Sequence, residues 1–95
     1  MYILSENLRY LRAQKEFSQQ QVANELIISR ARYSKYEEGK SEPPLDIMLR
    51  ISRYYQVSID LMLSVYLRKA AADDLKPPGY GRGTNSNESD LLQHY

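Results

Sequence analysis

Three cations lie close together in residues 29–37, SRARYSKYE. If this stretch is a helix, Tyr33 and Tyr36 share the inward face. The outward face near its N-terminus then carries Arg30, Ala31, Ser34 and Lys35. Arg and Lys side chains suit guanine O6 and N7, and an Ala methyl suits a thymine methyl. The stretch is therefore a candidate for reading base edges, and the alternative is an ordinary solvated basic face.

A second helix must precede this stretch to position it. Ser18 followed three residues later by Gln21 is a capping box, in which each side chain pairs with a backbone amide of the other. Phe17 lies just before the cap and is expected to pack onto Val22. We predict that this helix closes at Leu26-Ile27-Ile28.

The third helix is expected from about Arg30 to Glu37. Ser29 is its predicted cap, and Gly39 supplies the positive-φ residue that stops it. Two short helices joined by so tight a turn cannot bury their apolar faces alone, so other helices must complete the core.

Three further helices are predicted around this pair. The first begins at Ser5 and runs to Gln14 or Lys15, and the fourth begins near Pro44 and follows an apolar period to Tyr55. Residues 57–60, VSID, open a fifth helix that continues through 65–67 to about Ala72. The predicted fold class is all-α: a compact five-helix domain over residues 1–72.

The remainder, residues 73–95, differs in composition. KPPGYGRGTNSNES combines prolines, glycines and polar residues without periodicity, which predicts a flexible, disordered tail. The charge also divides here. Residues 1–72 carry eleven Lys and Arg against eight Asp and Glu, whereas residues 73–95 carry two against four. The basic excess therefore belongs to the predicted domain, where a polyanion would bind.

Composition limits the other function classes. The chain has 95 residues, no cysteine and a single histidine, His94. Disulfides and thiolate metal sites are thereby excluded, and we expect no cofactor, no metal site and no enzymatic activity. No apolar run is long enough to span a bilayer, and the N-terminus lacks a secretion signal, so we expect a cytoplasmic protein without a membrane partner.

Several motifs occur in an order and spacing that cover more than half of the chain. They are Leu8-x-x-Leu11-Arg12, Phe17-Ser18-Gln19, Val22-Ala23, Ile28-Ser29-Arg30, YSKYEEGK at 33–40, Pro43 and VSID at 57–60. This set resembles the Cro/C1-type helix-turn-helix family of phage repressors and bacterial regulators, also called the XRE family. The resemblance implies a lambda-repressor-like domain that places its third helix in the major groove of DNA.

The resemblance also assigns roles to residues. Positions matching Arg30, Ala31, Ser34 and Lys35 commonly read bases. The implied phosphate contacts are Gln19, Ser29, Arg32 and Lys40. Gln19 lies at a helix N-terminus, where free amides and the helix dipole favour a phosphate. Arg12 and Glu37 match positions that often form an ion pair between the first helix and the end of the third.

Two departures from the family pattern concern turns. The family usually has Gly where this chain has Ile27, and a β-branched residue at positive φ is strained. Either the turn takes another conformation, or Ile27 accepts the strain in return for burial. Gln56 likewise replaces a common Gly before Val57.

The nine tyrosines raise a separate question. Tyr54, Tyr55 and Tyr66 are candidates for a dimer surface, with core and rim packing as the equal alternative. The segment Val65, Tyr66 and Leu67 is the expected dimer contact.

The resulting hypothesis is a sequence-specific regulator of transcription that binds double-stranded DNA as a homodimer on a palindromic operator and represses. A domain this small makes few phosphate contacts, so two half-sites about 34 Å apart supply affinity and specificity. The alternative is an antitoxin or protein-interaction module whose tail engages a protein partner.

Overall fold

The structure is a computed structural model that describes residues 2–73. These residues form six helices: α1 (Tyr2–Lys15), α2 (Gln19–Leu26), α3 (Arg30–Glu37), α4 (Leu45–Tyr55), α5 (Ile59–Ser64) and α6 (Leu67–Asp73). The described range contains no strand, so the predicted all-α class is confirmed. Of the predicted tail, residues 74–95 lie outside the described residues.

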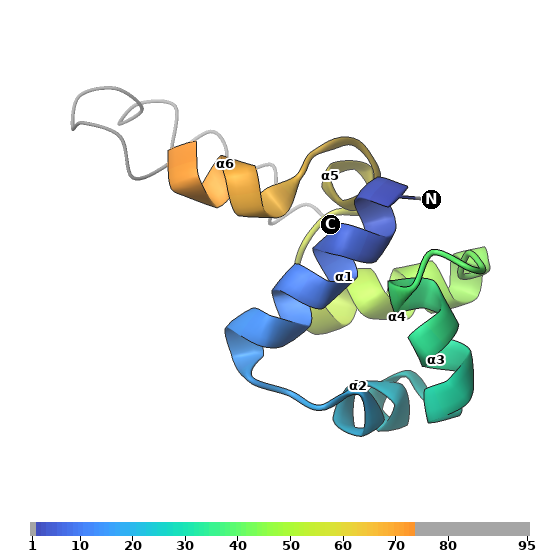
Figure 1. The fold of residues 1–95 in the computed structure, drawn as a ribbon. Helices are drawn as coiled ribbons and strands as arrows, with labels where there is room; N and C mark the ends of the chain where they lie inside the picture. The colour runs from blue at the N-terminus through green and yellow to red at the C-terminus, as the bar shows by residue number, and fades with distance from the viewer. Residues whose placement is uncertain (1, 74–95) are drawn as a thin grey trace.

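The long helix α1 organises the domain. It packs against α3, α5 and α6, while α2 packs against α3 and α4 (Figure 1). In Figure 1 the helices α2 and α3 occupy one end of the domain and α6 the other. The core between the helices is apolar and includes two buried tyrosines of α3 and one of α4. Its residues are Leu4, Leu8, Val22, Ala23, Leu26, Tyr33, Tyr36, Ile47, Met48, Ile51, Tyr55 and Met62.

Four of the helices end in the same way. After α1, α2, α3 and α4 the chain passes through one left-handed residue, respectively Glu16, Ile27, Gly39 and Gln56. The following amide then bonds back to a carbonyl five residues earlier: Phe17 N to Arg12 O, Ile28 N to Ala23 O, Lys40 N to Lys35 O and Val57 N to Ser52 O. This is the Schellman motif, which usually has glycine at the left-handed position. Only one of these four positions is glycine. The other three turns keep the hydrogen bonds of the motif without the glycine that usually accompanies them.

Ile27 adopts the usual left-handed geometry, with φ 60° and ψ 46°. Its side chain is 77% exposed, so burial does not compensate for the strain, and that part of the prediction is wrong. The turn is instead held by its backbone bonds and by Arg50, whose Nη1 donates to Leu26 O at 2.8 Å. Gln56 is left-handed in the same way, with φ 56° and ψ 45°.

The first helix begins earlier than predicted. It starts at Tyr2 instead of Ser5, because Leu4 belongs to the same apolar face as Leu8 and both are buried. Ser5 does not cap the helix. Its hydroxyl donates to Tyr2 O at 2.9 Å inside the first turns.

The predicted continuation of the fifth helix is interrupted. Val65 is extended (φ −129°, ψ 133°), and a separate helix, α6, begins at Leu67. The cause is Asn7 of α1, which is 1% exposed. Its Nδ2 donates to Met62 O at 2.8 Å and Val65 O at 2.7 Å, and its Oδ1 accepts from Leu67 N at 2.9 Å. The Asn7 amide thus supplies partners that a continuous helix would have supplied itself.

The tyrosines of α4 pack within their own domain. Tyr54 stacks on Phe17, with ring centroids 5.8 Å apart, and tilts against Tyr55 at 4.9 Å. Tyr55 belongs to the core, whereas Tyr66 is 39% exposed. Core and rim packing therefore accounts for Tyr54 and Tyr55, and Tyr66 retains an open surface.

Candidate nucleic-acid interface

The helix pair α2–α3 is built by two serine caps. Ser18 Oγ accepts from Gln21 N at 3.1 Å, and Gln21 Oε1 accepts from Ser18 N at 2.7 Å, which confirms the predicted capping box. Ser29 Oγ accepts from Arg32 N at 3.1 Å and begins α3. Both helices therefore start at residues whose local chemistry alone favours a start.

The two faces of α3 differ sharply. Tyr33 and Tyr36 are buried, and their rings meet edge to face at 6.5 Å. On the opposite face Arg30, Ala31 and Lys35 are exposed, and Ser34 is half-buried. All four predicted base-reading residues therefore lie on the side of the helix that the domain leaves uncovered.

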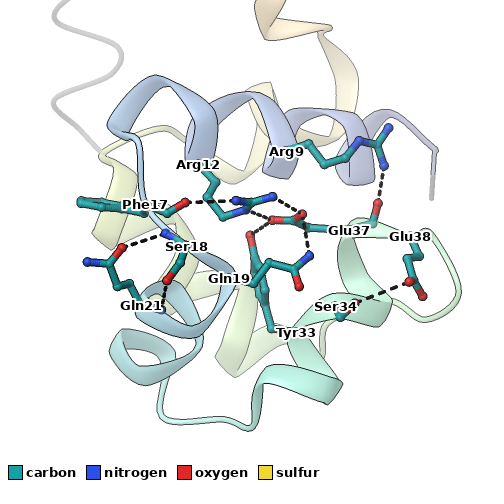
Figure 2. Close-up of polar contacts among 10 residues, drawn as sticks. All are labelled: Arg9, Arg12, Phe17, Ser18, Gln19, Gln21, Tyr33, Ser34, Glu37 and Glu38. Atoms are coloured by element: carbon teal, nitrogen blue, oxygen red, sulfur yellow. Dashed lines mark hydrogen bonds and ion pairs between the residues drawn. The ribbon is translucent and has the colours of Figure 1, made fainter.

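Glu37, at the end of α3, is the centre of a buried polar network (Figure 2). Its side chain is 3% exposed. Arg12 donates twice, from Nε to Oε2 at 2.6 Å and from Nη2 to Oε1 at 3.0 Å, so the expected ion pair is present and two-pronged. The Tyr33 hydroxyl donates to Oε2 at 2.5 Å, and Gln19 Nε2 donates to Oε1 at 3.1 Å. One carboxylate therefore ties α1, α2 and α3 together.

The electrostatics of this network favour a charged Glu37. Burial opposes ionisation, but hydrogen bonds from Arg12, Tyr33 and Gln19 outweigh it and hold the pKa of Glu37 below its ordinary value. For Tyr33, burial and the hydrogen bond to Glu37 raise the pKa of the phenol. The hydrogen bond to Glu37 likewise raises the pKa of Arg12 against the opposing effect of burial. At neutral pH the pair is therefore ionised and Tyr33 remains a donor.

Further bonds fix where α3 ends relative to α1. Arg12 Nη1 donates to Phe17 O at 3.0 Å, and Arg9 Nη1 donates to the backbone oxygen of Glu37. Two arginines of α1 thus hold the side chain and the backbone of one residue (Figure 2). Arg9 was not among the predicted site residues. A lone Arg on an exposed helix position gives no signal of a partner 28 residues away.

The predicted phosphate contacts fall into two groups. Gln19 and Ser29 are already engaged, with Glu37 and with the α3 backbone respectively. Arg32 and Lys40 are exposed, and Lys40 Nζ lies 3.5 Å from Glu38 Oε1. Arg32 and Lys35 line an open depression of about 460 Å³ between α3 and the loop that leads to α4. The other residues that line the depression are Ser29, Ala31, Tyr36, Ser41, Glu42 and Pro44.

Glu38 is the second residue that sequence reasoning missed. It follows α3 directly, keeps helical geometry (φ −84°, ψ −8°), and lies one turn beyond Ser34 on the uncovered face. The sequence does place Glu38 two residues before Lys40, which was a predicted phosphate contact. Its interaction with Lys40 depends on the turn through Gly39, whose φ is 73°.

These elements define a helix-turn-helix domain: two capped short helices, a left-handed turn, and a second helix with one face left open. The family model described as helix-turn-helix matches residues 8–62, which is more than half of the chain. The chain therefore belongs to the Cro/C1-type (XRE) helix-turn-helix family. This family consists of DNA-binding regulators of transcription and is not an enzyme class.

Several described proteins are similar to this chain. The HTH-type transcriptional activator BcrR of Enterococcus faecalis is 40% identical over 60 residues, covering 63% of this chain and 29% of that protein. The uncharacterized HTH-type transcriptional regulator YqaE of Bacillus subtilis is 41% identical over 61 residues, covering 64% and 53%. The cryptic phage CTXphi transcriptional repressor RstR of Vibrio cholerae is 29% identical over 62 residues, covering 65% and 56%.

The shared region thus spans between 29% and 56% of these three relatives. No solved structure matches the chain. Among residues 2–73, no helix has the length and apolar character needed to cross a membrane.

Proposed function

We propose that the chain is a sequence-specific regulator of transcription that inserts α3 into the major groove of double-stranded DNA. The observation that carries this proposal is the open face of α3. Of its four candidate base-reading residues, Arg30, Ala31 and Lys35 are exposed and Ser34 is half-buried, while the buried Glu37 network fixes the helix from behind. An α-helix of ordinary diameter fits the major groove, where the base edges distinguish all four pairs.

Within this proposal the residues divide by task. Base edges are read by Arg30, Ala31, Ser34 and Lys35. The phosphate backbone is contacted by Gln19, Ser29, Arg32 and Lys40. Gln19 uses one Nε2 hydrogen for Glu37 and keeps a second for a phosphate oxygen. The depression beside Arg32 and Lys35 gives room for one strand of the duplex backbone.

The proposed binding unit is a homodimer on a palindromic operator. Eight contact residues on one small domain give limited affinity, and a second copy on a half-site one helical turn away doubles the contacts. Tyr66, exposed between α5 and α6, is the proposed contact, together with its neighbours Val65 and Leu67. Light scattering should then give the mass of two chains on operator DNA. The mass of a monomer both free and on DNA would remove this part of the proposal.

The proposed regulatory effect is repression. Repression by occupancy requires only that the operator overlaps a promoter, and the relative RstR is named a repressor. The relative BcrR is named an activator, and this chain matches only 29% of its length.

The decisive experiment is selection of bound sequences from random duplex DNA with the purified protein. A palindromic motif is the expected result, and failure to enrich any motif would contradict the proposal. Exchanging Arg30 or Lys35 for Ala should relax the motif at single positions. Exchanging Gln19 or Lys40 for Ala should instead weaken all sequences alike, and the loss of the Lys40 charge should also reduce the salt dependence of binding.

A further inference from the structure

An acidic side chain stands among the residues proposed to meet DNA. Glu38 lies one turn beyond Ser34, on the same side of α3 as Ala31 and Lys35. Ser34 Oγ donates to Glu38 Oε2 at 3.5 Å, and Lys40 Nζ lies 3.5 Å from Oε1 (the Ser34 bond is drawn in Figure 2). One carboxylate therefore holds a proposed base reader and a proposed phosphate contact at once.

The stability of the fold does not explain an acidic residue at position 38. A negative charge at the C-terminal end of a helix opposes the helix dipole. The Lys40 ion pair is exposed, with 70% of the Lys40 side chain and 49% of the Glu38 side chain accessible, and such pairs contribute little. Glu37, one residue earlier, is the buried carboxylate that holds the domain together.

We propose that Glu38 is a specificity-determining residue that acts against non-specific DNA. This inference rests on the proposed function. On a random duplex, Glu38 repels the nearby phosphates and competes with the DNA for Ser34 and Lys40. On the operator, its carboxylate accepts a hydrogen bond from a base amino group in the major groove, such as cytosine N4, which offsets the repulsion.

The expected size follows from Coulomb's law. In water, one carboxylate and one phosphate about 7 Å apart change an affinity by about threefold, before screening by salt. With one or two phosphates near Glu38, repulsion should weaken binding to random DNA by about three- to tenfold at low ionic strength.

The test compares Glu38→Gln with the wild-type protein on two duplexes, the selected operator and a random sequence of equal length. The variant should bind the random duplex about three- to tenfold more tightly, with a smaller gain on the operator, so that the specificity ratio falls. The control is Asp60→Asn, which makes the same change in net charge at an exposed position on α5. The control should leave the ratio unchanged.

Two results would overturn the inference: equal gains on both duplexes, as from net charge alone, or no gain on either. Failure of the proposed function is seen separately, because the wild-type protein would then enrich no motif and would bind both duplexes equally or not at all, before any variant is compared. A double-mutant cycle with Lys40→Gln adds a second measurement. If Glu38 competes for Lys40, the gain from Glu38→Gln on random DNA should shrink in the Lys40→Gln background, and an undiminished gain would contradict that competition.

Discussion

The two ends of this domain are each tied to α1 by one buried polar side chain, but with opposite chemistry. At the α2–α3 end, the charged Glu37 receives hydrogen bonds from side chains of three helices. At the α5–α6 end, the neutral Asn7 bonds only to backbone groups of the segment that it fixes. The first arrangement links helices that are already formed, whereas the second decides where helices stop and start.

This difference implies different sensitivities. An ionised network depends on every partner, because a buried charge left unpaired is strongly unfavourable. A neutral amide bonded to backbone groups is insensitive to pH across the ordinary range. Variants at the two ends should therefore differ in how much stability they lose, in how that loss depends on pH, and in which helices become less stable.

The largest effect is expected from Glu37→Gln. The variant keeps the shape of the side chain but leaves Arg12 without its counterion, and it should lower the free energy of unfolding by about 3–5 kcal/mol. Urea denaturation measures this loss. Glu38→Gln is the matched control, one residue along and exposed, and it should change stability by less than about 0.5 kcal/mol. An unchanged unfolding midpoint for Glu37→Gln would show that the pair is solvated.

A smaller loss is expected at the other end from Asn7→Ala. Three hydrogen bonds disappear, and the expected cost is about 2–3 kcal/mol. Hydrogen exchange should show faster amides in α6 with little change in α3. Asn24→Ala is the control, since Asn24 is exposed and only accepts a bond from Gln20 one turn away. Equal loosening of α3 and α6 would contradict the separation of the two ends.

The pH dependence of stability should distinguish the two ends directly. The pKa of Glu37 in the folded protein lies below the ordinary value of 4.5. The stabilisation from the ionised Glu37 is therefore complete above pH 4.5 and is lost as the pH falls through the folded pKa. The Asn7→Ala variant should keep the acid-side slope of the wild-type protein, whereas Glu37→Gln should flatten it. Urea midpoints measured from pH 7 down to about pH 3 test both statements. The same slope in all three proteins would rule out a role for Glu37 in acid sensitivity.

Two buried tyrosines sharpen the comparison within the core. Tyr33→Phe removes a donor to the Glu37 carboxylate and should cost about 1.5–3 kcal/mol. The Tyr55 hydroxyl is buried and makes no hydrogen bond of ordinary geometry, so Tyr55→Phe should be neutral or stabilising by up to about 1 kcal/mol. Thermal unfolding of the two variants gives the difference. A loss at Tyr55 as large as that at Tyr33 would reveal a partner for the Tyr55 hydroxyl.

The smallest effects concern the turns. Ile27→Gly should stabilise by about 1 kcal/mol, since relief of a strained β-branched residue exceeds the added flexibility of the unfolded chain. Gln56 has the same backbone geometry as Ile27 but is not β-branched, so Gln56→Gly should change stability by less than about 0.5 kcal/mol. Differential scanning calorimetry compares them, and a loss of stability from Ile27→Gly would mean that the exposed side chain has a favourable contact.

Local signals predicted one end of the molecule better than the other. The serine caps, the end of α3 at Gly39 and the open face of α3 follow from residues a few positions apart. The family resemblance added the Arg12–Glu37 pair, which no local pattern contains. The break before α6 depends on Asn7, about 60 residues earlier, and was missed for that reason. The engagement of Gln19 by Glu37 also needed three dimensions, because it requires α2 and α3 to be docked.

The bond from Asn7 to the first amide of α6 also determines the direction in which the chain leaves the body of the domain. Figure 1 shows α6 at the opposite end from α2 and α3. A fluorescent reporter or surface anchor joined through Lys69, which is exposed on α6, would stand clear of the proposed groove-facing helix. Immobilisation on a sensor through that lysine should therefore leave the open face of α3 accessible to the duplex.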